Sequence, residues 1–74
     1  MKIRIDDVIQ NDTIFRHALI GAIFEVVELK DLGNGWSVAK LKHDRDWKIY
    51  SYSYSIAKDE VFIMRGIKYT IVDQ

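Results

Sequence analysis

The amino-acid sequence predicts a small all-β domain of five to six antiparallel strands. Short segments in which apolar and polar residues alternate, separated by turn-forming residues, are the main signal. The chain of 74 residues also contains no proline. Because a proline-free sheet has unprotected edges, we expect the strands to close into a barrel. At this length we expect a single domain over residues 1–74.

The N-terminal part is expected to hold one strand and one segment of undecided structure. Residues 2–6 place Ile3 and Ile5 on one face, which predicts a half-buried strand. In residues 8–21, Asp12 could cap a short helix, and an ordered loop fits equally well. Either structure would connect the first strand to the second.

The strongest hairpin signal lies in the middle of the chain. Residues 22–30 are rich in β-branched and aromatic side chains, which favours a strand, and residues 36–42 favour another. Between them, Gly33-Asn34-Gly35 supplies residues that tolerate positive φ angles. We therefore expect these two strands to pair antiparallel.

The C-terminal half predicts three more strands. Residues 47–56 alternate strictly, which predicts one strand. Residues 61–64 and 67–72 predict two others, joined by a tight reversal at Arg65-Gly66.

The predicted core collects the apolar side chains of these strands. Each strand should turn one face inward, and the strand at residues 22–30 is apolar on both faces, as expected if it bends through the core. The predicted core residues are Ile5, Ile23, Phe24, Val26, Val27, Val38, Leu41, Ile49, Val61, Ile63 and Ile71.

Composition limits the classes of function. Eleven basic and eleven acidic side chains give a formal net charge of zero, which argues against a dedicated binder of nucleic-acid backbones. The absence of cysteine excludes thiolate nucleophiles and Cys-based zinc sites, and it fits a reducing compartment. No apolar run approaches the roughly 20 residues that span a bilayer. We therefore expect a cytoplasmic protein without a membrane segment.

Catalysis, metal binding and cofactor binding are not expected. His17 and His43 are the two histidines, and neither has the spacing of paired metal ligands or of a base beside a nucleophile. His43 could form a weak cluster with Asp44 and Asp46. A solvated turn rich in charge explains the same residues, because turns favour aspartate.

Three passages resemble the small SH3-like barrel proteins encoded by bacteriophages and prophages. They are residues 19–27, the hairpin at 33–35, and residues 54–61. Ala57 departs from the proline often found in that family, and residues 65–73 extend beyond its usual end. The resemblance implies an SH3-like barrel and a phage or prophage accessory protein of a bacterial host. It implies no functional residues, because most members have no assigned role.

Binding is expected where aromatic and basic side chains interleave. We expect a protein partner, held by exposed aromatic side chains, with the chain acting as an adaptor or an inhibitor. The alternative is a nucleic acid, its bases stacked on the rings and its phosphates on the basic groups. The same rings could instead fill the core, and monomer and homodimer both remain open. The candidate binding residues are Trp36, Lys40, Lys42, Arg45, Trp47, Lys48, Tyr50, Tyr52 and Tyr54.

Overall fold

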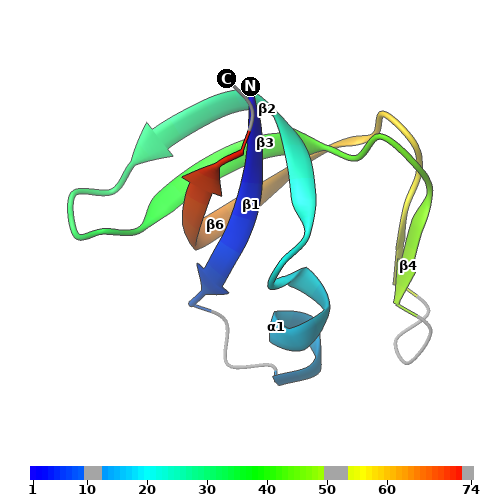
Figure 1. Cartoon of the computed structure of the whole chain (residues 1–74), viewed down its shortest axis with the longest axis horizontal. Coiled ribbons are helices and arrows are strands. Elements are labelled where there is room, and N and C mark those ends of the chain that lie inside the picture. Colours follow the sequence, from blue (N-terminus) through cyan, green and yellow to red (C-terminus); the bar gives the residue numbers. More distant parts are fainter. Residues whose placement is uncertain (10–12, 50–53, 73–74) are drawn as a thin grey trace.

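The computed structural model describes residues 1–9, 13–49 and 54–72, and most of them lie in β-strands (Figure 1). In chain order the elements are β1 (Lys2–Val8), α1 (Thr13–Leu19), β2 (Ile23–Asp31), β3 (Ser37–Lys42), β4 (Trp47–Ile49), β5 (Tyr54–Ile56) and β6 (Val61–Ile71). This order confirms the prediction of a mostly β fold. It also decides between helix and loop after the first strand, because α1 is a short helix.

Four of these strands form one antiparallel sheet that closes on itself. β1 pairs with β2, β2 with β3, β3 with β6, and β6 with β1. Closure gives each strand neighbours on both sides and so removes most of the exposed sheet edge. β4 and β5 pair with each other in a separate two-stranded sheet, which lies to one side in Figure 1.

The hairpin between β2 and β3 confirms the turn predicted from the glycines. Gly33 and Gly35 have φ angles of 86° and 87°, a conformation that costs glycine little. The Leu32 N–H donates to the carbonyl oxygen of Trp36 over 2.9 Å. The Trp36 N–H in turn donates to Oδ1 of Asn34 over 3.2 Å. The turn is therefore held by both its backbone and its central side chain.

β6 is a single strand of eleven residues, so the tight reversal predicted at Arg65-Gly66 is wrong. The pairing of β6 with β3 shifts register here, because Val38 lies opposite Arg65 whereas Ser37 lies opposite Ile67. Gly66, with a φ of 74°, is thus an extra residue in the strand, a β-bulge. Glycine with positive φ serves both a tight turn and a bulge, so the local sequence did not separate them.

The single strand predicted over residues 47–56 is also wrong. Within this segment β4 pairs antiparallel with β5, with Trp47 opposite Ile56 and Lys48 opposite Ser55. Side chains alternate along two short strands as they do along one long strand.

The core lies within the closed sheet. Phe24 is its largest fully buried side chain, and Leu19, the last residue of α1, packs into it. The buried cluster consists of Ile3, Ile5, Val8, Leu19, Phe24, Ala39, Leu41, Met64 and Ile67.

The predicted core is confirmed only in part. Ile5, Phe24 and Leu41 are buried, and Val26 and Val38 are half-buried. The side chain of Ile49 lies outside the part of the chain that the structure describes. Five other predicted core residues are wrong, because they are 46–53% exposed: Ile23, Val27, Val61, Ile63 and Ile71.

Asp6 lies where the pairing of β1 with β6 shifts register. Its carboxylate accepts a hydrogen bond from the Thr70 hydroxyl over 2.5 Å and another from Nε of Arg4 over 2.9 Å. The bond from Thr70, and after it the bond from Arg4, holds the pKa of Asp6 below its ordinary value. The cluster thus links β1 to β6 through a charged acceptor.

We expect Asp6→Asn to lower the melting temperature near neutral pH and to lower it less as the solution becomes acidic. A carboxyl whose pKa is lowered on folding stabilises the fold above its unfolded pKa. That stabilisation is lost as the pH falls through the folded pKa, so wild type and variant should converge. Thermal melts of both proteins across the acid range measure this. A difference that stays constant with pH would contradict it, and Thr70→Val should raise the pKa of Asp6 in an NMR titration.

Candidate binding cleft

A cleft of about 710 Å³ opens beside the closed sheet. One wall comes from the N-terminal end of β2, and the other from the segment that joins β3 to β4. Lys2, Asp59 and Val72 complete the lining. The two walls contribute Ile23, Glu25, Lys42, Asp44, Arg45 and Trp47 to the lining.

The cleft exists because β3 separates from β2. The last pair in their ladder joins Glu25 to Lys42. β2 itself extends to Ile23, which lies opposite Arg4 of β1. The chain after Lys42 therefore leaves the sheet and forms the far wall of the cleft.

His43 is a buried residue in that wall, with 4% of its surface exposed. Its ring meets Phe24 edge to face at 5.2 Å and stacks on Trp47 at 6.4 Å between centroids. Its Nδ1 lies 2.8 Å from the carbonyl oxygen of Arg45. Nδ1 also lies 3.3 Å from the backbone nitrogen of Arg45, so the ring nitrogen contacts both backbone groups of that residue. The expectation of a solvated turn is therefore wrong at His43.

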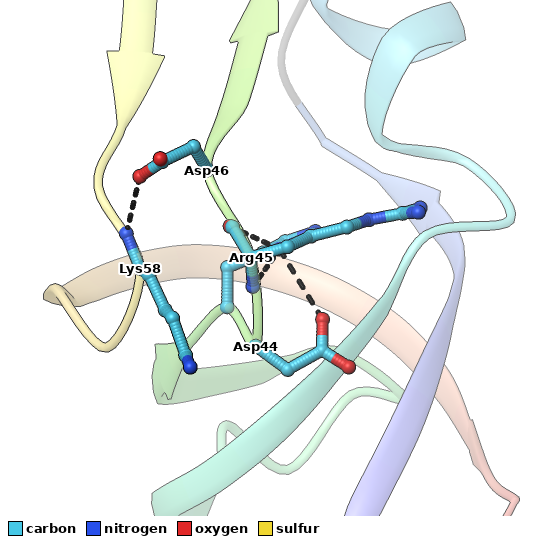
Figure 2. Close-up of polar contacts among 5 residues, drawn as sticks. Asp44, Arg45, Asp46 and Lys58 are labelled. Atoms are coloured by element: carbon cyan, nitrogen blue, oxygen red, sulfur yellow. Dashed lines mark hydrogen bonds and ion pairs between the residues drawn. The ribbon is translucent and has the colours of Figure 1, made fainter.

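Backbone contacts join this wall to the turn before β6. Oδ1 of Asp46 accepts a hydrogen bond from the Lys58 N–H over 2.9 Å (Figure 2). The Asp59 N–H donates to the carbonyl oxygen of His43 over 2.9 Å. Asp44 approaches the His43 ring more distantly, with 3.6 Å between Oδ1 and Nδ1. The cluster of His43, Asp44 and Asp46 considered from the sequence therefore does not form as a unit, because Asp46 bonds to the backbone of Lys58.

The structure brings three of the predicted binding residues together. Lys42, Arg45 and Trp47 all line the cleft, and Arg45 is exposed while Trp47 is half-buried. In Figure 2 the side chain of Arg45 extends away from the carboxylates of Asp44 and Asp46. The lining of the cleft thus includes both an aromatic ring and a guanidinium group.

The other predicted binding residues lie elsewhere. Trp36 is at the opposite end of β3, where Nζ of Lys68 lies 4.6 Å from its ring centroid. Lys40 and Lys48 do not line the cleft. Tyr50 and Tyr52 lie outside the described residues, as does the side chain of Tyr54.

Lys40 and Lys42 on β3 are each paired with an acidic residue on the neighbouring strand β2. Lys40 lies opposite Glu28, and Lys42 lies opposite Glu25. Opposite charges at cross-strand positions attract one another. The two lysines are therefore part of a mixed-charge surface instead of a basic stripe.

Sequence reasoning missed Ile23 and His43 as parts of the cleft. Ile23 is a predicted core residue, yet it is 48% exposed and lines the cleft. The signal that could have found it is the apolar character of both faces of residues 22–30, since a strand buried on one face leaves the other exposed.

No protein-family model, curated protein or solved structure matches this chain. Within residues 1–9, 13–49 and 54–72, no three histidine, aspartate or glutamate side chains are grouped so that they could hold a metal ion. No helix in these same ranges has the length and apolar character needed to cross a membrane.

Proposed function

We propose that the chain is a small non-enzymatic binding module with an SH3-like barrel fold, and that it binds a protein in the cleft beside β2. The closed four-stranded antiparallel sheet supports the fold assignment. The likeness of residues 19–27, 33–35 and 54–61 to phage and prophage proteins supports an accessory role in the cytoplasm of a bacterial host. The module acts there as an adaptor or an inhibitor.

The single observation that carries this proposal is the composition of the cleft. It combines exposed Ile23 and half-buried Trp47 with the charged group of Arg45. Protein interfaces have this character, with aromatic and arginine anchors next to apolar surface and a polar rim.

The charges around the cleft favour a protein over a nucleic acid. The lining balances its charges, with the acidic Glu25, Asp44 and Asp59 beside the basic Lys2, Lys42 and Arg45. A phosphate backbone binds where basic groups can replace its counterions, and carboxylates in the same lining oppose this. The nucleic-acid alternative therefore has less support from the geometry than from the sequence.

Site-specific crosslinking tests the proposal. Ile23→p-benzoylphenylalanine places a photoreactive group in the cleft, and Ile63→p-benzoylphenylalanine is the matched control, because Ile63 is equally exposed on β6 but does not line the cleft. In a bacterial lysate we expect a discrete protein adduct from position 23 and none from position 63. Nuclease treatment should leave the adduct unchanged.

Charge reversal supplies the second arm of the test. Arg45→Glu should reduce the adduct at position 23 by about tenfold, which corresponds to the loss of one charge-assisted contact. Lys48→Glu makes the same charge change on β4 outside the cleft and should have no effect. Equal adducts from both positions would overturn the proposal, and loss of the adduct on nuclease treatment would support the nucleic-acid alternative.

A further inference from the structure

The backbone of β2 alternates between its two neighbours along the cleft wall. The Ile5 N–H donates to the carbonyl oxygen of Ala22, and the Val26 N–H donates to that of Met1, both over 2.9 Å. The even-numbered residues of this part of β2 therefore point their backbone groups toward β1. In an antiparallel ladder the next residue points the opposite way.

The backbone N–H and C=O groups of the odd-numbered residues in this stretch therefore point toward β3. Glu25 finds its partner there in Lys42. Ile23 would pair next with Asp44, but the ladder between the two strands ends at Glu25 and Lys42. The N–H and C=O of Ile23 are therefore an unpaired strand edge, and both Ile23 and Asp44 line the cleft.

We propose that the partner enters the cleft as an extended peptide segment that adds a strand to β2 at Ile23. This inference rests on the proposed function and specifies the form of the partner. An added strand supplies the donor and acceptor that the Ile23 backbone lacks. The segment takes the place beside β2 that β3 leaves after Lys42.

Arg45 determines the charge of the segment. Its side chain lines the cleft and contacts no carboxylate among the described residues. In Figure 2 it points away from the two aspartates that flank it in sequence. A guanidinium group pairs best with a carboxylate in a two-pronged contact. The segment therefore carries an aspartate or glutamate beside an apolar residue that packs against Ile23 and Trp47.

A displayed library of random linear peptides provides the probe. Peptides that bind the wild-type protein are selected, and those that also bind the Arg45→Glu variant are then removed. We expect the retained peptides to share an acidic residue next to an apolar one. Against Arg45→Glu the selected peptide should bind about tenfold more weakly, and replacing its acidic residue with lysine should restore binding. Lys48→Glu should bind the original peptide like wild type.

An N-methyl scan of the selected peptide tests strand addition itself. Each backbone amide is methylated in turn, which removes one donor. Because Ile23 offers one carbonyl oxygen to an added strand, we expect methylation at one position of the peptide to weaken binding by about tenfold and methylation at the positions beside it to have little effect. In parallel, the Ile23 amide should exchange rapidly with solvent in the free protein and become protected in the complex.

The outcomes separate the two proposals. If position 23 crosslinks a protein but no single methylation weakens binding, strand addition is wrong and the binding function stands. If position 23 captures nothing and no selected peptide competes at the cleft, the proposed function fails as well. A protein that dimerises through Ile23 in sedimentation experiments would also overturn the inference, because the occupant would then be a second copy.

Discussion

Phe24→Ala should lower the free energy of unfolding by about 3–5 kcal/mol, the usual cost of removing a buried aromatic ring. Phe24 is 1% exposed and is the largest fully buried side chain among the described residues. Its ring meets His43 at 5.2 Å and Phe62 at 5.4 Å, edge to face in both contacts. Since a domain of this size is stable by only a few kcal/mol, we expect the variant to be largely unfolded.

Urea denaturation followed by tryptophan fluorescence measures the loss, because Trp47 stacks on His43 next to Phe24. Phe24→Leu is the control, since it keeps an apolar side chain in place and should cost less than the alanine variant. It also remains measurable if the alanine variant does not fold. An unchanged urea midpoint for Phe24→Ala would show that β2 turns a different face to the core.

Structural features that depend only on residues close together in the sequence were predictable. Ile3 and Ile5 alternate with charged residues, and both are fully buried in β1. Gly33 and Gly35 require no partner beyond their own turn to favour a reversal. The mostly β fold and its central hairpin followed from such local signals.

The choice of the inward face was not predictable where both faces of a strand are apolar. In β6, Val61 and Ile63 alternate with Phe62 and Met64. Met64 is buried and Phe62 packs against the core, whereas the other two are about half exposed. Side chains of similar hydrophobicity occupy both faces, so only the register with β3 decides between them.

The cleft depends on contacts between distant residues, and for this reason only its basic and aromatic side was anticipated. Lys42, Arg45 and Trp47 are neighbours in sequence and therefore stay together in space. Ile23 joins them because β3 leaves β2 after the pair Glu25 and Lys42. The residues around Lys42 do not by themselves indicate where β3 separates from β2.

Gly66→Ala should lower the free energy of unfolding by about 2–5 kcal/mol, through two effects that add. The φ of 74° at Gly66 costs a residue with a Cβ about 1–2 kcal/mol. The new Cβ would also lie 3.0 Å from Cβ of Ile9 and 3.1 Å from its Cγ2. Overpacking of this kind costs about 1–3 kcal/mol.

Ile9 cannot easily move aside to accommodate the new methyl group. Its N–H donates to the carbonyl oxygen of Gly66 over 2.9 Å, and a Cβ moves only with its own backbone. Relieving the contact would therefore strain or break the hydrogen bond that holds the end of β1 to the bulge.

Gly35→Ala is the matched control for the bulge. Gly35 has a φ of 87°, and a Cβ there would meet nothing within 4 Å, so this variant carries the backbone cost alone. We expect it to lose about 1–2 kcal/mol, and the excess loss in Gly66→Ala to measure the contact with Ile9. Urea denaturation of both variants gives the two values. Equal losses would show that Ile9 yields without cost, and a Gly66→Ala variant as stable as wild type would refute the bulge.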